Sequence, residues 1–181
     1  MKIIVLQGSH NRNGSTSILV EHFTRGAEES GHQVQRIDVA EKRINQCTGC
    51  NTCRNDGPCI LSELRDDNHQ IRKAILDADM LVFATPLYYY GMSAQLKTVI
   101  DRFYAYNSSI NRKHLKSALL AAASNNEDWS FDALRSHYKA MVCYLNLDDE
   151  GMVLGKGCGT PDMTKKTIFP NNAYELGKKL R

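Results

Sequence analysis

The chain has 181 residues and lacks any long hydrophobic run. No apolar stretch approaches the roughly 18 residues that a helix needs to cross a bilayer, and no basic-plus-apolar leader precedes the first strand-like residues. Linkers rich in proline and serine, internal repeats and low-complexity segments are also missing, and proline occurs only 4 times. We therefore expect a single domain over residues 1–181, in the cytoplasm and with no membrane partner.

Strong charge is missing as well. The formal net charge is +3, and lysine and arginine are scattered apart from a lysine-rich C-terminus. This distribution gives no footprint for nucleic acid. The chain does contain 6 cysteines, which in a reducing compartment indicate thiols or metal ligands in preference to disulfides.

The hydrophobic pattern alternates between strand and helix. Strands are expected at residues 2–7, 33–39, 80–85, 116–124 and 152–154, and helices at about 15–30, 66–77, 94–103, 132–144 and 172–179. This alternation predicts an α/β fold with a parallel sheet and helices on both faces. Ligands of such sheets bind beyond the carboxyl ends of the strands, so three loops are expected to line the site: residues 8–17, 86–91 and 124–129.

The first of these loops, GSHNRNGSTS, leads from a strand into a helix that begins near Ser15. Unpaired N–H groups at a helix N-terminus suit an anion, and Gly8 and Gly14 allow close backbone approach. The loop matches neither the ATP-binding nor the dinucleotide-binding glycine pattern, which leaves a single phosphate of a mononucleotide. The candidate phosphate ligands are Ser9, Asn11, Asn13, Ser15, Thr16 and Ser17. The alternative is a loop that only caps its helix.

Four of the cysteines are clustered at Cys47, Cys50, Cys53 and Cys59, in the pattern C-x2-C-x2-C-x5-C. Three cysteines at intervals of three are typical of the run that wraps an iron–sulfur cluster. Structural zinc usually joins two separated C-x2-C pairs, so zinc is the weaker interpretation. Unmetallated thiols at a subunit interface are the other alternative.

Residues 85–102, TPLYYYGMSAQLKTVIDR, resemble a motif of the NAD(P)H-dependent FMN reductases, a family of flavodoxin-like proteins. The first loop is similar to the opening motif of the same family, although His10 replaces a proline and Ser15 an asparagine. The positions that agree with that opening motif are Gly8, Ser9, Gly14 and Thr16. The resemblance continues to the C-terminal AYELGKKL.

This resemblance implies a flavodoxin-like, doubly wound sheet of five parallel strands in the order 2-1-3-4-5. It also implies FMN, with its phosphate in the first loop and its isoalloxazine ring against residues 86–91. A flat amphipathic ring suits this apolar and aromatic loop. The implied ring contacts are Pro86, Leu87, Tyr88, Tyr89 and Gly91, with Ser124 and Asn125 from the third loop. The alternative for the tyrosines is a core or interface cluster.

The activity implied is that of an oxidoreductase in which FMN accepts hydride from NADH or NADPH and passes electrons to a flavin, a quinone or another small acceptor. The flavin carries the chemistry, so no catalytic side chain is expected. The cysteine spacing also resembles the iron–sulfur flavoprotein branch, which holds a [4Fe-4S] cluster in an insertion that here covers about residues 44–65. An electron carrier that exchanges electrons with ferredoxin and a thiol-based redox sensor are competing hypotheses. The family resemblance favours a homodimer or homotetramer.

Overall fold

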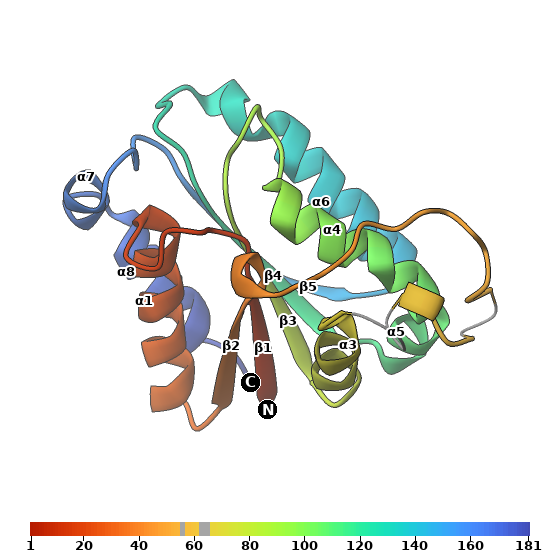
Figure 1. Ribbon diagram of the computed structural model, residues 1–181. Helices are drawn as coiled ribbons and strands as arrows, with labels where there is room; N and C mark the ends of the chain where they lie inside the picture. Colours follow the sequence, from red (N-terminus) through yellow and green to blue (C-terminus); the bar gives the residue numbers. More distant parts are fainter. Residues whose placement is uncertain (55–56, 62–65) are drawn as a thin grey trace.

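The computed structural model describes residues 1–54, 57–61 and 66–181. In these residues one sheet of five parallel strands has the order β2-β1-β3-β4-β5, which confirms the predicted topology (Figure 1). The strands are β1 (Lys2–Gln7), β2 (Gln33–Asp38), β3 (Met80–Pro86), β4 (Lys116–Ala122) and β5 (Asp148–Gly155).

Helices cover both faces of the sheet (Figure 1). One face carries α1 (Ser15–Glu29) and α8 (Phe169–Lys178), with α7 (Pro161–Lys165) beside α1. The other face carries α3 (Asn68–Leu76), α4 (Ala94–Asp101), α5 (Asn107–Lys113) and α6 (Asp132–Leu145). Short 3-10 turns are η1 (Val39–Glu41), η2 (Arg102–Ala105) and η3 (Asp128–Phe131).

The two faces of the sheet build two hydrophobic cores. In β1, Ile3 and Val5 pack with residues of α1 and α8, whereas Ile4 and Leu6 pack with residues of α3, α4 and α6. These side chains are 0% exposed, because a strand that is covered on both faces is buried along its whole length. The near-continuous apolar runs of the central strands follow from this arrangement.

Helices α1 and α8 approach each other through two glycines. A Cβ at Gly26 would lie 2.2 Å from the carbonyl oxygen of Tyr174, and a Cβ at Gly177 would lie 2.2 Å from the carbonyl oxygen of Phe23. Any larger residue would force the two backbones apart. The contact fixes α1 against the sheet and therefore fixes the position of its N-terminus.

Three elements differ from the sequence expectation. Helix α5 has a single buried side chain, Ile110, and α7 is a five-residue helix that begins at Pro161, so neither produces a periodic apolar signal. Strand β5 begins at Asp148, earlier than expected, because it is an edge strand whose first residues are polar and exposed or half-buried. The other predicted elements are found within a few residues of their expected bounds.

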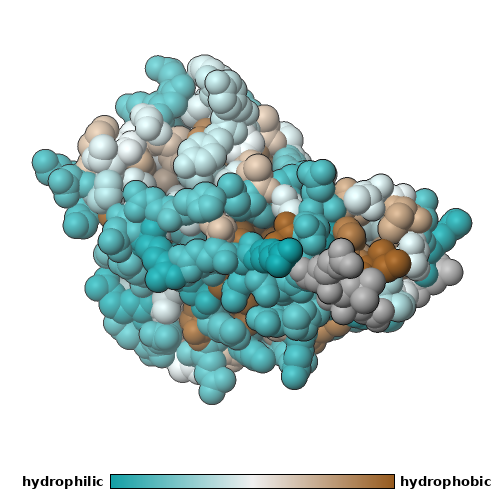
Figure 2. Space-filling model, viewed as in Figure 1, coloured by the Kyte–Doolittle hydropathy of each residue, from teal (hydrophilic) through white to brown (hydrophobic). Residues whose placement is uncertain are grey.

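The surface seen in Figure 2 is mainly hydrophilic. Figure 2 shows hydrophobic residues in the middle of this face and on the projection at the right, where Figure 1 places the cysteine-containing segment, with smaller patches elsewhere. Within the residues that the structure describes, no helix combines the length and the apolar character needed to cross a membrane.

Candidate functional site at the carboxyl edge of the sheet

Four loops surround a cavity of about 160 Å³ beyond the carboxyl ends of the strands. The loop after β1 supplies Ser9, Asn11, Gly14, Ser15 and Thr16, and the loop after β3 supplies Pro86, Leu87 and Tyr88. The end of β4 and the loop after β5 complete the lining with Ala122, Ala123, Ser124, Cys158 and Gly159. The cavity therefore lies where ligands of doubly wound sheets bind.

The first two loops are joined through Ser93. Its hydroxyl donates to the carbonyl of Gly8 at 2.8 Å and accepts the N–H of Leu96 at 3.4 Å, which caps α4. The backbone N–H of Ser93 donates to Thr85 Oγ1 at 2.9 Å. A Cβ at Gly8 would lie 2.5 Å from Ser93 Oγ, so glycine is required for this close approach. Ser93 thus holds the first and second loops at a fixed separation.

The first loop is also held from within by Asn11 and Ser17. Asn11 Oδ1 accepts the N–H of Asn13 at 3.1 Å, and the Asn11 carbonyl accepts the Ser17 hydroxyl at 3.2 Å. Ser17 is 0% exposed, and its oxygen also accepts from Gln7 Nε2 at 3.1 Å and from Arg36 at 3.2 Å. These bonds turn Ser17 into the loop and away from the cavity lining.

The N-terminus of α1 faces the cavity without a side-chain cap. Its N-cap residue is Gly14, and the next two residues, Ser15 and Thr16, line the cavity. First-turn N–H groups and the positive end of the helix dipole are thus combined with serine and threonine hydroxyls. This donor set fits a phosphate, and the residues present fit the mononucleotide that the sequence predicts.

The second loop is a tight turn that carries three tyrosines. Tyr88 and Gly91 exchange two backbone hydrogen bonds of 3.1 Å, and Tyr89 and Tyr90 between them have φ values of 45° and 63°. Positive φ at two successive positions defines a turn that normally takes asparagine or glycine, so two tyrosines here store backbone strain. Tyr88 is 60% and Tyr89 101% exposed, which rules out the core alternative for both side chains.

An aromatic contact and an ion pair close the rim. The rings of Tyr90 and Trp129 lie 5.0 Å apart between centroids, which joins the second loop to the third. Lys156, in the loop after β5, pairs with Asp128 of the third loop. Its hydrogen bond lowers the pKa of the Asp128 carboxyl below the ordinary value. The rim is thus built from three loops far apart in sequence.

The structure brings together some of the predicted ligands and not others. Those that line the cavity are Ser9, Asn11, Ser15, Thr16, Pro86, Leu87, Tyr88 and Ser124, whereas Asn13, Ser17, Tyr89, Gly91 and Asn125 do not line it. Asn125 instead shapes its own loop, since Oδ1 accepts the N–H of Glu127 at 2.8 Å. Sequence reasoning missed Cys158 and Gly159, although both follow the carboxyl end of β5 and the same positional rule would have found them.

The cysteine segment lies apart from this cavity. Cys47 and Cys50 are exposed, Cys59 is half-buried and Cys53 is 7% exposed. The Thr52 hydroxyl, 3.3 Å from Cys50 Sγ, lowers the pKa of the Cys50 thiol, whereas burial raises the pKa of Cys53. In residues 1–54, 57–61 and 66–181 no three side chains of histidine, cysteine, aspartate or glutamate form a group that could hold a metal ion. The predicted insertion also includes residues 55–56 and 62–65, which lie outside the described residues.

A buried arginine fixes this segment to the rest of the molecule. Arg102 is 1% exposed and donates to Asp66 Oδ2 at 2.6 Å, to the carbonyl of Asn45 at 2.8 Å and to Cys59 Sγ at 3.3 Å. Asp66 also accepts the backbone N–H groups of Asn45 and Asn68, each at 3.1 Å. The Arg102–Asp66 ion pair thus joins both ends of the segment, at Asn45 and at Asp66, to η2.

Known structures define the class of this fold as flavodoxin-like. A NAD(P)H:quinone oxidoreductase from Methanothermobacter marburgensis superposes with a TM-score of 0.83 over 100% of this chain and 96% of that chain, at 20% identity. An FMN-dependent NADH-azoreductase from Bacillus anthracis gives a TM-score of 0.70 over 99% and 97% of the two chains, at 15% identity. At such identities the likeness shows the fold alone.

The family follows from the sequence itself. The model of the NADPH-dependent FMN reductases matches residues 1–159, and the chain belongs to this family. An iron–sulfur flavoprotein of Methanocaldococcus jannaschii is 29% identical over 187 residues, covering 99% of this chain and 95% of that protein. An iron–sulfur flavoprotein of Archaeoglobus fulgidus is 35% identical over 106 residues, which are 59% of this chain and 47% of that protein. The match thus spans about half the length of the Archaeoglobus relative.

Proposed function

We propose that the protein is an FMN-dependent oxidoreductase that takes hydride from NADPH or NADH and passes electrons to a flavin, a quinone or another small acceptor. The observation that carries the proposal is the uncapped N-terminus of α1, which faces the same cavity as the Pro86–Tyr88 loop. An anion site and an apolar, aromatic surface thus meet in one place. Family membership supports the same activity.

The residues divide according to the two ends of the cofactor. Ser9, Thr16 and the first-turn N–H groups of α1 would hold the phosphate, while Pro86, Leu87 and Tyr88 would hold the ring and Ser124 its polar edge. Bound FMN supplies a ring that accepts a hydride and releases electrons. Because the flavin carries the chemistry, we assign no acid or base to the protein.

Anaerobic mixing of the FMN-loaded protein with NADPH, and separately with NADH, tests the activity. The blue absorbance band of the flavin should bleach with either or both nucleotides and should return when a quinone is added. A flavin that remains oxidised with both nucleotides rejects the reductase and leaves an electron carrier or a redox sensor.

A second candidate function is that of an iron–sulfur flavoprotein that exchanges electrons with ferredoxin. The C-x2-C-x2-C-x5-C spacing and the names of the Methanocaldococcus and Archaeoglobus relatives favour it. The described conformation does not gather the thiols into a ligand set, so cluster binding would require the segment to rearrange.

Iron and acid-labile sulfide should be measured on anaerobically purified wild-type protein and on Cys53→Ser. A cluster predicts iron and sulfide in the wild type and a labile or three-iron centre in the variant, with FMN binding retained in both. Wild-type protein that holds FMN but no iron after reconstitution rejects the cluster.

The proposal includes a cytosolic homodimer or homotetramer. Free thiols, three of them exposed, suit a reducing compartment. Tyr88, Tyr89 and Trp129 leave an exposed aromatic surface beside the cavity, which a neighbouring subunit could cover. Light scattering coupled to size-exclusion chromatography measures the assembly, and a monomeric mass at micromolar concentration contradicts this part of the proposal.

A further inference from the structure

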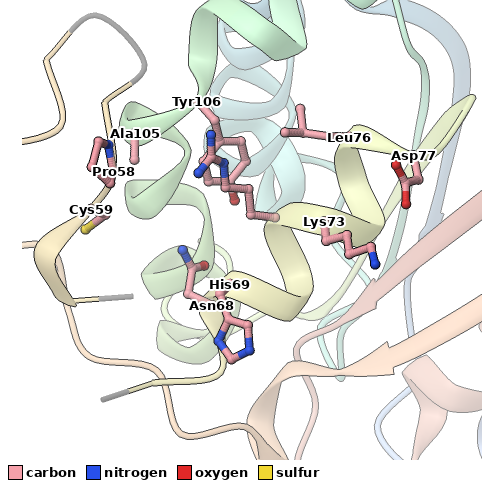
Figure 3. Close-up of a pocket in the computed structure, with 10 residues that line it drawn as sticks. Pro58, Cys59, Asn68, His69, Lys73, Leu76, Asp77, Ala105 and Tyr106 are labelled. Atoms are coloured by element: carbon pink, nitrogen blue, oxygen red, sulfur yellow. The ribbon is translucent and has the colours of Figure 1, made fainter. Parts of the chain in front are cut away.

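A second cavity lies between α3 and the η2–α5 region, and none of its described lining residues belongs to the cavity at the carboxyl edge of the sheet (Figure 3). Its volume is about 340 Å³, at the small end of the range for ligand pockets. Figure 3 shows Tyr106 on one side, His69 and Lys73 projecting from α3, and Cys59 on the neighbouring segment. Nothing in the proposed oxidoreductase chemistry uses this cavity.

Two buried donors on its wall are unsatisfied. In the described part of the chain, the Tyr106 hydroxyl and Arg72 Nε have no hydrogen-bond partner, and Tyr106 is 0% exposed. Buried polar groups are normally paired with protein, water or a ligand, because an unpaired group loses its hydration without compensation. A phenol keeps its proton at neutral pH, and burial raises the pKa of Tyr106 further. Both groups therefore require an acceptor.

The charges around the cavity favour a negatively charged acceptor. Arg72 and Lys73 both line it, and the Arg72 guanidinium lies 5.7 Å from the centroid of the Tyr106 ring. Among the described lining residues Asp77 carries the only carboxylate. His69 also lines the cavity, and its Nδ1 donates to the Asp66 carbonyl at 2.9 Å. The described lining thus carries two cations, Arg72 and Lys73, against the one carboxylate of Asp77.

Part of the remaining wall is apolar, and Asn68 and His69 are its polar part. Leu76 of α3, Ala105 of η2 and Pro58 line the cavity together with the Tyr106 ring. A bare inorganic anion would leave these surfaces facing water. A molecule with one anionic end and an apolar body would contact both kinds of wall.

We propose that this cavity binds a small organic acid. Its carboxylate accepts hydrogen bonds from Tyr106 and Arg72, Lys73 adds charge at the mouth, and its apolar body lies against Leu76 and Ala105. Because Cys59 lines the same cavity, a bound acid also shields the Cys59 thiol from reagents.

Calorimetric titration of the full chain with benzoate tests the site, with benzamide as the uncharged probe of the same shape. Benzoate should bind at a single saturable site, about tenfold or more tightly than benzamide. Tyr106→Phe, which keeps the ring and removes only the hydroxyl, should weaken benzoate several-fold. Lys73→Gln, at an exposed position that does not threaten folding, should do the same. Lys139→Gln, an exposed cation on α6, is the matched control and should bind like the parent.

Alkylation gives an independent measurement. Saturating benzoate should slow the reaction of iodoacetamide with Cys59 and leave the exposed Cys143 unaffected, as followed by peptide mass spectrometry. The proposal is overturned if benzoate shows no saturable binding, if benzamide binds as tightly, or if Tyr106→Phe and Lys73→Gln both retain the affinity of the parent. The cavity then holds water only.

Discussion

Tyr88 and Tyr89 are neighbours in the chain, yet they have different surroundings. Tyr88 lines the cavity and is 60% exposed, whereas Tyr89, with φ of 45°, projects into solvent at 101% exposure. The tight turn reverses the chain between Tyr88 and Gly91 and so separates the two side chains. Of these two tyrosines, Tyr88 is therefore the one that we expect to contact a ring bound beside Pro86 and Leu87.

Tyr88→Ala should weaken FMN binding about threefold to tenfold, because an aromatic contact contributes about 0.5–1.5 kcal/mol. The free energy of unfolding should change by no more than about 0.5 kcal/mol, as at other surface positions. Flavin fluorescence titration and urea denaturation measure the two effects. Tyr89→Ala is the matched control, and its FMN affinity should stay near that of the parent. A Tyr88→Ala variant that loses stability but keeps its FMN affinity would contradict this assignment.

At the scale of the elements, a buried ion pair attaches the cysteine segment to η2. The Arg102–Asp66 pair is 2.6 Å long, and both side chains are at most 1% exposed. Breaking a buried pair leaves one charge without compensation, which is far more unfavourable than losing an exposed pair.

Arg102→Met should therefore lower the free energy of unfolding by about 3–5 kcal/mol, because it leaves the Asp66 carboxylate buried and unpaired. Lys97→Met removes one partner of an exposed pair with Asp101 in the adjacent helix α4 and should cost about 1 kcal/mol or less. Chemical denaturation of both variants makes the comparison. Equal effects of the two substitutions would show that the buried pair does not hold the segment.

The sequence predicts elements with a regular burial pattern, either apolar along the whole strand or alternating with the period of the strand or helix, and it misses elements without one. Strands β1, β3 and β4 are central and covered on both faces, so their apolar runs are sufficient evidence. The half-exposed edge strand β5 and the short helices α5 and α7 lack such a signal. The loops that line the cavity could be predicted because ligands of such sheets bind beyond the carboxyl ends of the strands. Applied to the carboxyl end of β5, the same rule would also have predicted Cys158.

The individual ligands were harder to predict than the loops. Ser15, Thr16 and Ser17 look equivalent in the sequence, yet Ser17 turns inward because Gln7, Arg36 and the Asn11 carbonyl occupy its hydroxyl. Those partners lie on other elements, and no local pattern marks them. The rim contact between Tyr90 and Trp129 likewise joins two loops that are far apart in the sequence, so no local pattern predicts it.

At the scale of the whole molecule, stability should depend on pH through two histidines. Burial is the largest cause that lowers the pKa of His22, and Arg25 adds to it against the opposing effect of Glu21. Burial also lowers the pKa of His137, with Lys97 adding and Asp101 opposing. In the unfolded chain these histidines have a pKa near 6.5. Below that pH the unfolded chain therefore binds more protons at these two positions than the folded chain does.

The free energy of unfolding should therefore be highest above about pH 6.5 and should fall as the pH drops through the lowered values of the folded state. Urea denaturation between pH 8 and pH 5 measures the slope, and a double variant, His22→Gln with His137→Gln, should flatten it. A further loss at more acidic pH is expected from Glu29, Glu41 and Asp128, whose pKa values hydrogen-bonded partners lower. Stability that rises on acidification from pH 7 to pH 5 would contradict the prediction.

The central claim is that the cavity at the carboxyl edge holds FMN with its phosphate at the N-terminus of α1. The most direct measurement compares FMN with riboflavin, which lacks the phosphate, in the wild type and in the double variant Ser9→Ala with Thr16→Ala. Each lost charge-assisted hydrogen bond contributes about 1.5–3 kcal/mol, so the double variant should bind FMN about a hundredfold or more weakly, while riboflavin binds both proteins equally. FMN held as tightly by the double variant as by the parent would place the phosphate elsewhere and contradict the account.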